Sequence, residues 1–375
     1  MTPARILAAD DKPAAFHAGP FPSGPVDGIT DVAGVRVAHV TKIAGTGVLH
    51  PGVGPVRTGA TAILQNRDPW TQRCAAGFYA LNGNGEMTGT HWIEEAGFIE
   101  HPILLTATTN VPRVADGVID WMIRVHPEIG VRSDVPLPVV AECNDEALND
   151  AQGRHVHADE IPALLDAAAA GQFNRGNVGA GTGMHGFGFK GGIGSASRKL
   201  SATLGGYTVG VLLNLNDGLR AQLLMAGVRV GQAFAHDLLP VFPRRAAFAE
   251  HGRAAGGSII VIVATDAPLE ARVLGALAKR ATLGLARTGW TSTVSSGDLF
   301  LAISTSNVVS RDLAKRSVVL ESDEDRLDAL YSATADSTES AVYDALWHAS
   351  TMVGRDGITF YGLPHARVRE LLASR

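Results

Sequence analysis

Continuous apolar runs and amphipathic stretches alternate along this chain, a pattern typical of buried strands and the helices that cover them. Apolar runs predict strands over residues 59–65, 102–110, 137–142, 207–216 and 258–265. Amphipathic spacing predicts helices over residues 114–125, 268–288 and most of 323–354. Alternation around a glycine predicts a hairpin over 25–41, and two strand segments about a Ser-Gly-Asp turn are predicted over 289–305. The chain is therefore expected to fold as a mixed α/β protein.

Composition favours one well-packed domain in a reducing compartment. Hydrophobic residues make up 46% of the 375 residues and charged residues 18%, which suits a sizeable core, and no shift in composition marks a second domain. The net charge of −5 argues against nucleic acid or an anionic membrane as the main partner and favours a small neutral or cationic ligand. The two cysteines do not indicate a disulfide framework, and the first residues lack a signal-peptide core. We therefore expect a cytoplasmic protein without a membrane span.

The junction before Ser258 is the first candidate for chemistry. Gly256 and Gly257 precede Ser258, which opens the apolar run of 258–265, and residues 240–253 are rich in proline and charge, as in an exposed connector. This arrangement suits a self-cleaving precursor. The Ser258 hydroxyl would attack the Gly257 carbonyl, water would release the ester, and Ser258 would become a new N-terminus whose amine serves as base. The same glycines also suit a plain turn before a core strand, and the residues alone leave both interpretations open.

Polar residues at the ends of predicted strands supply further candidates. Glu142 ends an apolar run, where its carboxylate either meets a substrate or lies exposed in a loop. Asn216, with Asn214 as the second choice, either donates to an oxyanion or belongs to a turn. Ser296 and Asp298 either orient and polarise a nucleophile or form an ordinary turn. Each of these assignments needs support from elsewhere in the chain.

Two other motifs could indicate a cofactor or a metal, but neither has the sequence context that such a site requires. Residues 181–186 match G-x-G-x-x-G, but more glycines and a β pattern follow where a dinucleotide-binding motif requires a helix. His155 and His157 stand near Asp159 and Glu160 at a predicted helix start, where capping or solvation is the more common role than metal binding. We expect neither a metal nor an organic cofactor.

Seven motifs in fixed order carry a resemblance that covers nearly the whole chain. They are GITDVAGVRV at 28–37, NGEMTG at 84–89, GNVGAGTGM at 176–184, KGGIG at 190–194, the Gly257-Ser258 junction, SGD at 296–298 and MVGRDG at 352–357. With these motifs the chain resembles the DmpA/BapA family of N-terminal-nucleophile aminopeptidases, which comprises L-aminopeptidase/D-Ala-esterase/amidases and β-peptidyl aminopeptidases. The resemblance implies a four-layer αββα sandwich related to that of ornithine acetyltransferases. It also implies one domain, 1–375, cut into an α chain of 1–257 and a β chain of 258–375, with α/β pairs assembling as homo-oligomers.

The resemblance also implies a role for each candidate. Ser258 corresponds to the nucleophile, Ser296 to the supporting serine, Asp298 to its acidic partner, Asn216 to the oxyanion donor and Glu142 to the carboxylate that binds the substrate ammonium.

The chain departs from the family pattern at two positions close to these candidates. Asp217 follows the oxyanion asparagine where relatives usually carry an aromatic residue, and Asn144 stands where another aromatic residue is expected.

The implied activity is release of N-terminal amino acids, α-L, D-Ala or β, from small peptides, amides or esters, without a cofactor. Acyl transfer of the ornithine acetyltransferase kind is an alternative, but it uses a threonine nucleophile where this chain has Ser258. Hydrolysis of ω-amide oligomers is a second alternative within the hydrolases. A binding protein that never cleaves itself is a third.

Overall fold

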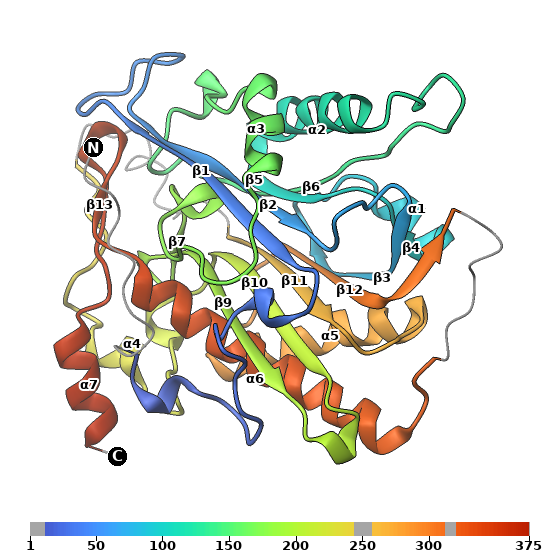
Figure 1. Cartoon of the computed structure of the whole chain (residues 1–375). Coiled ribbons are helices and arrows are strands. Elements are labelled where there is room, and N and C mark those ends of the chain that lie inside the picture. The colour runs from blue at the N-terminus through green and yellow to red at the C-terminus, as the bar shows by residue number, and fades with distance from the viewer. Residues whose placement is uncertain (1–11, 244–256, 312–319, 375) are drawn as a thin grey trace.

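Two β-sheets stack face to face, and helices cover the outer face of each sheet (Figure 1). The computed structural model describes residues 12–243, 257–311 and 320–374. The expected αββα sandwich is therefore confirmed for the described residues. The connector predicted over 240–253 lies largely outside them, as do Gly256 and the start of the chain.

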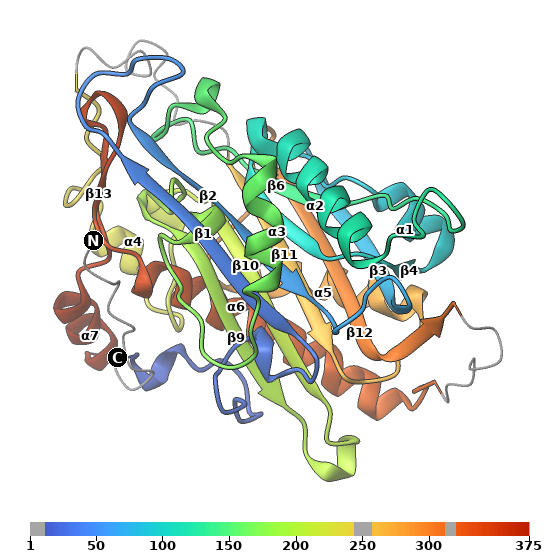
Figure 2. The same ribbon diagram turned by 45° about the horizontal axis from the view of Figure 1, so that its top comes forward.

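The first sheet has the strand order β1-β2-β5-β6. Its strands are β1 (Arg36–Ala44), β2 (Val56–Leu64), β5 (Ile103–Ala107) and β6 (Val139–Cys143). Helices α2 (Val111–Val125) and α3 (Ile161–Asp166) lie over its outer face (Figure 2). Along β2, Ala60 and Ala62 pack beneath these helices, whereas Ile63 points into the space between the sheets, as the two-residue period of a strand requires.

The second sheet has the strand order β4-β3-β12-β11-β10-β9. Its strands are β3 (Gln72–Gly83), β4 (Phe98–Ile99), β9 (Gly192–Lys199), β10 (Thr208–Asn216), β11 (Ser258–Thr265) and β12 (Gly297–Ser310). Helices α5 (Ala271–Arg287) and α6 (Glu324–His348) cover its outer face. β11 pairs with β10 in antiparallel and with β12 in parallel orientation, so it lies inside the sheet.

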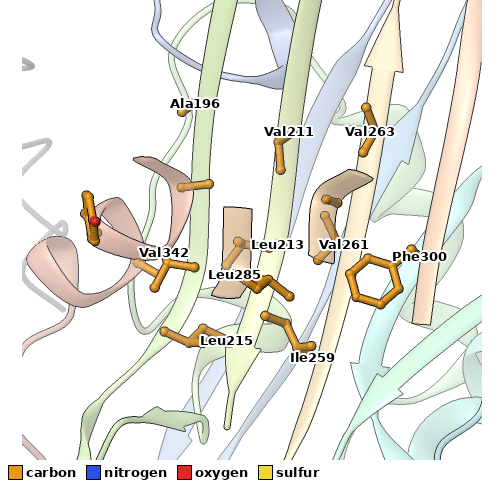
Figure 3. Packing of buried hydrophobic residues seen from close by; sticks show 14 of the residues in the cluster. Ala196, Val211, Leu213, Leu215, Ile259, Val261, Val263, Leu285, Phe300 and Val342 are labelled. Carbon is orange, nitrogen blue, oxygen red and sulfur yellow. The ribbon is translucent and has the colours of Figure 1, made fainter. Parts of the chain in front are cut away.

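The β11 strand is buried on both faces, which explains its unbroken apolar sequence. Ile259, Val261 and Val263 point to the outer face of the sheet, toward α5, and belong to the same core as Leu285 (Figure 3). Ile260, Ile262 and Ala264 belong to the core between the two sheets. A strand held in this way gives its first residue, Ser258, a rigid support.

Shorter elements complete the structure. They are α1 (Thr90–Ala96), α4 (Val230–Ala233), α7 (His365–Ala373) and two small hairpins, β7 (His185–Gly186) with β8 (Phe189–Lys190) and β13 (Met352–Val353) with β14 (Thr359–Phe360). Of the described helices, none combines the length and apolarity needed to cross a bilayer.

Two predicted elements are wrong and one strand has no predicted counterpart. The hairpin predicted over 25–41 is instead a 3₁₀ turn at Ile29–Asp31 followed by β1. The turn does not pair with β1, because the Ile29 N–H donates to Ser195 Oγ. Residues 297–310 form one continuous strand preceded by irregular backbone. Strand β3 has no clear alternation in its sequence, because its residues pass from buried to exposed along its length.

A buried charge cluster joins the N-terminal segment to α6. The Asp344 carboxylate is fully buried and accepts hydrogen bonds from Lys12 Nζ at 2.9 Å and Arg175 Nη1 at 2.9 Å. The Ser195 N–H donates to its other oxygen at 3.0 Å, and His348 Nδ1 lies 3.2 Å away. Burial alone would raise the pKa of Asp344, but Arg175 and Lys12 together hold it well below its usual value.

Candidate active site

Ser258 lies directly opposite Asn216 in the β10–β11 ladder and beside Gly297 in the β11–β12 ladder. Its side chain is buried, and Asn216 Nδ2 donates to Ser258 Oγ at 3.2 Å. A nucleophile and an amide donor from segments 42 residues apart are thus brought together by strand register alone. The sheet places an amide where it can stabilise negative charge near the Ser258 hydroxyl.

Backbone groups fix the orientation of the Asn216 carboxamide. Its Oδ1 accepts from the His185 N–H at 3.1 Å, and its Nδ2 also donates to the Asn144 carbonyl at 2.9 Å. The His185 N–H requires Oδ1 as its acceptor, and the Asn144 carbonyl requires Nδ2 as its donor. These two partners therefore determine that Nδ2 faces Ser258. Asn214, the second choice from the sequence, instead donates to the Ala180 carbonyl at 3.5 Å.

Ser296 and Asp298, from the start of β12, form a second polar cluster. Ser296 Oγ donates to Asp298 Oδ1 at 2.5 Å, and Ser292 Oγ donates to the other carboxylate oxygen. Burial raises the pKa of Asp298 to about 6, and the nearby Asp217 charge adds to this effect, while the two serine hydrogen bonds oppose it. The Asp298 carboxyl can therefore change its protonation state close to neutral pH.

Asp217 belongs to this cluster although sequence reasoning assigned it no role. Its Oδ2 accepts from Trp290 Nε1 at 2.7 Å and lies 3.2 Å from Ser296 Oγ. Its Oδ1 lies against Gly257, where an added Cβ would come within 2.0 Å of it. The sequence carried no local signal for this contact, because it follows from the register of the antiparallel ladder, in which Asn216 opposite Ser258 brings residue 217 beside residue 257.

The Gly257 carbonyl, which precedes the candidate nucleophile, is held by the backbone. It accepts from the Gly297 N–H at 3.2 Å, as a continuation of the parallel β11–β12 pairing. The hydrogen bond polarises this carbonyl on the side of β12, whereas Asn216 approaches from β10.

Glu142 lies near the end of β6, on the sheet that faces the candidate nucleophile. Its side chain is buried, which excludes the exposed-loop interpretation. Oε1 accepts from the Glu86 N–H at 3.0 Å, and Thr108 Oγ1 donates to Oε2. Burial raises the pKa of Glu142, and these two hydrogen bonds oppose the rise. Within the described residues no cation is among the groups that shift the pKa of this carboxylate, so its negative charge is not balanced by a neighbouring side chain.

Gly85 joins Glu142 to the rest of the site. A Cβ added at Gly85 would lie 3.3 Å from Glu142 Oε1 and 3.0 Å from the Cα of Gly297. Glu142 is therefore separated by about one residue from the strand position that pairs with Ser258. Cys143, next along β6, contacts Ser258 itself, and burial raises the pKa of its thiol well above the usual value, which keeps it neutral.

The histidines of the predicted helix start lie in a separate part of the structure. His155 Nε2 is 3.0 Å from Asp150 Oδ2, and the His157 N–H donates to Glu160 Oε2 at 2.8 Å, as a helix cap does. In the described part of the chain, no group of three or more His, Cys, Asp or Glu side chains is arranged to hold a metal ion.

Comparison with known proteins identifies the family. The profile of peptidase family S58 matches residues 27–360. The β-peptidyl aminopeptidase BapA of Sphingosinicella microcystinivorans is 42% identical over 354 residues, which cover 93% of this chain and 88% of that protein. A family profile and a relative that both span most of the chain leave no large segment outside the match.

Solved structures agree with the fold. A Burkholderia sp. β-aminopeptidase superposes with a TM-score of 0.84 at 37% identity, covering 95% of this chain and 96% of its own. The L-aminopeptidase D-Ala-esterase/amidase of Ochrobactrum anthropi, described as a variant of the Ntn hydrolase fold, superposes with a TM-score of 0.83 at 35% identity, covering 96% and 97%. These comparisons favour peptide and amide hydrolysis over acyl transfer. The chain belongs to peptidase family S58 and is an aminopeptidase or amidase with the Ntn hydrolase fold.

Proposed function

We propose that this chain is a self-processing serine aminopeptidase that releases the N-terminal residue of small peptides, amino-acid amides or esters through an acyl-enzyme on Ser258. The observation that carries the proposal is the position of Ser258. Its hydroxyl lies at the first residue of a buried strand, directly after a glycine and 3.2 Å from an oriented amide donor. A nucleophile that must also become an N-terminus requires this position.

Maturation begins when Ser258 Oγ attacks the Gly257 carbonyl carbon. The C–N bond to Ser258 breaks as the C–Oγ bond forms, and the hydroxyl proton passes to the departing amine. Water then hydrolyses the ester, which leaves Gly257 as the C-terminus of 1–257 and Ser258 as the N-terminus of 258–375. The Gly297 N–H, already bonded to the Gly257 carbonyl, supports the charge that develops on its oxygen.

The two chains would stay together after the cut. Strands β11 and β12 of the β chain lie between β10 and β3 of the α chain in one sheet, with ladder hydrogen bonds on both sides. Separating them would expose the apolar faces of both strands to water, which hydrophobic burial opposes.

In the mature enzyme the α-amine of Ser258 acts as the general base. Such an amine has a pKa of about 7.7–8.0 in a model peptide, so part of it is unprotonated at neutral pH. Ser296 and Asp298 orient this amine or carry its proton, and Asn216 donates to the tetrahedral oxyanion. Glu142 pairs with the ammonium of the substrate, which restricts attack to the first peptide bond.

The proposal is tested on a denaturing gel and by assay. Purified protein should run as two bands, with Ser258 as the first residue of the smaller. A panel of p-nitroanilides of L-Ala, D-Ala and a β-homoamino acid then identifies the preferred class of substrate. An intact chain that hydrolyses these amides fully would contradict the mechanism.

The family resemblance is also the ground for proposing a homo-oligomer of α/β pairs in the cytoplasm. Light scattering of the processed protein measures the assembly directly, and a mass equal to a single α/β pair would contradict this proposal.

A further inference from the structure

The side chain of Lys190, on β8, is fully buried and has no carboxylate partner among the described residues, and burial lowers its pKa well below the usual value. Its Nζ donates to three backbone carbonyls, those of Gly181 at 3.2 Å, Gly191 at 2.8 Å and Met184. The backbone carbonyls around Nζ act in the opposite direction to burial, because they stabilise the charged form. Three acceptors around one nitrogen are satisfied only by an ammonium group, which has three N–H donors. Burying this positive charge costs the free energy of its hydration. We therefore ask which function of the site the charge supports.

The peptide group between residues 184 and 185 connects this charge to the candidate oxyanion donor. Its carbonyl, on Met184, accepts from Lys190 Nζ, and its N–H, on His185, donates to Asn216 Oδ1 at 3.1 Å. The Asn216 amide then donates through Nδ2 to Ser258 Oγ at 3.2 Å. Two amide groups in series therefore lead from the ammonium to the nucleophile.

Hydrogen bonds in such a chain strengthen one another. A cation on a peptide carbonyl draws electron density away from the N–H of the same group, which becomes a better donor. The same effect passes through the Asn216 carboxamide, so its Nδ2–H meets a developing negative charge more favourably. The interior screens this polarisation weakly, because its effective dielectric is far below that of water.

We propose that Lys190 is a positioning residue for hydrolysis, whose ammonium orients and polarises the Asn216 amide through the 184–185 peptide group. The proposal rests on the proposed function, because it requires Asn216 to be the oxyanion donor. It assigns the buried lysine a contribution to the rate of the chemical step and none to the binding of the substrate ammonium.

The test is a double-mutant cycle with Lys190→Met and Asn216→Ala, assayed on the best p-nitroanilide of the panel and normalised to processed β chain. Asn216→Ala should lower kcat by about 10²–10³-fold, as loss of an oxyanion donor does. Lys190→Met should lower kcat by about tenfold with KM within about twofold. When Asn216→Ala is already present, adding Lys190→Met should lower kcat by less than about twofold, because the amide that connects Lys190 to the oxyanion has been removed.

Arg198→Met is the matched control. Arg198 is a buried cation on β9 that also donates to backbone carbonyls, those of Ala18 and Ser197, and, unlike Lys190, it lies 3.5 Å from a carboxylate oxygen, Asp27 Oδ1. Its ladder partner on β10, Val209, is seven residues from Asn216, or roughly 23 Å along the strand. Arg198→Met should lower the thermal midpoint but leave kcat within about twofold. Lys190→Arg, which keeps the charge, should recover part of the kcat that Lys190→Met loses.

Three outcomes would overturn the proposal. They are an unchanged kcat in Lys190→Met, losses that multiply in the double variant, and a loss in KM alone. If Lys190→Met matures slowly, kcat is measured on the fraction that has been processed, because the assay is normalised to processed β chain. If Asn216→Ala itself leaves kcat unchanged, the oxyanion assignment fails, which distinguishes an error in the proposed function from an error in the role of Lys190.

Discussion

Asn216 and Ser258 are direct cross-strand partners on β10 and β11, with Nδ2 and Oγ 3.2 Å apart. A slip of one residue would turn every side chain of β11 to the opposite face and bring Ile259 to the position of Ser258, the candidate nucleophile. Because both faces of β11 are buried, such a slip is strongly disfavoured. The geometry of the site therefore depends on the packing of the whole sheet.

Ser258→Ala should abolish both maturation and hydrolysis, because no other hydroxyl occupies the first position of β11. The expected result is one full-length band and no release of p-nitroaniline. Ser295→Ala is the control, since Ser295 is exposed one residue before Ser296. Full processing of Ser258→Ala would mean that the nucleophile is another residue.

Glu142→Gln should reduce kcat/KM on free-amine p-nitroanilides by at least about tenfold, because the amide has no charge to pair with the substrate ammonium. Precursor cleavage should proceed at a normal rate, since it involves no free ammonium substrate. Glu95→Gln serves as control, because Glu95 is an exposed carboxylate on α1. Equal losses of cleavage and hydrolysis in Glu142→Gln would identify a structural role.

The pH dependence of kcat should carry the signature of Asp298. Its pKa is raised to about 6 by burial, so the carboxylate that accepts from Ser296 is lost as the pH falls through this value. The Ser258 amine must also be unprotonated, with a pKa near 7.7–8.0. A plot of log kcat should therefore rise with a slope near one from pH 6 to pH 7.5 and more steeply below pH 6. In Asp298→Asn the steeper part should disappear, and its persistence would assign it to another group.

Gly257→Ala should slow maturation, because its Cβ would lie 2.0 Å from Asp217 Oδ1. Asp217→Gly removes the whole side chain, including the Cβ that would lie 2.7 Å away, so the double variant should mature faster than Gly257→Ala alone. The single Asp217→Gly variant measures what loss of the contact with Ser296 costs by itself. A double variant no faster than Gly257→Ala would show that the glycine is needed for a reason other than this contact.

Asp344→Asn should destabilise the protein by about 3 kcal/mol, because it removes the buried counter-charge of Arg175 and leaves Lys12 with Asp27 as its remaining carboxylate partner. The pKa of Asp344 is held well below its unfolded value, so its contribution to stability is present above about pH 4 and is lost as the pH falls further. Urea unfolding at pH 7 measures the loss, with kcat expected within about twofold of the parent. An unchanged midpoint would contradict the assigned role.

The sequence alone determined the strongly patterned elements and the candidate chemistry. The apolar run of 258–265 became β11, and the amphipathic stretch of 268–288 became α5, because a strand buried on both faces and a helix with one apolar face leave clear local patterns. The motif set led to the family, and with it to Ser258, Asn216, Ser296, Asp298 and Glu142 as site candidates.

Only the tertiary structure decided what these residues contact. Strand β3 and the continuity of β12 depend on pairing between segments more than 200 residues apart, which no local pattern records. Asp217 contacts Gly257 across neighbouring strands of the sheet. Lys190 is linked to Asn216 through the peptide group between residues 184 and 185. Local sequence determines which faces of an element are buried, whereas sheet register determines which distant side chains meet.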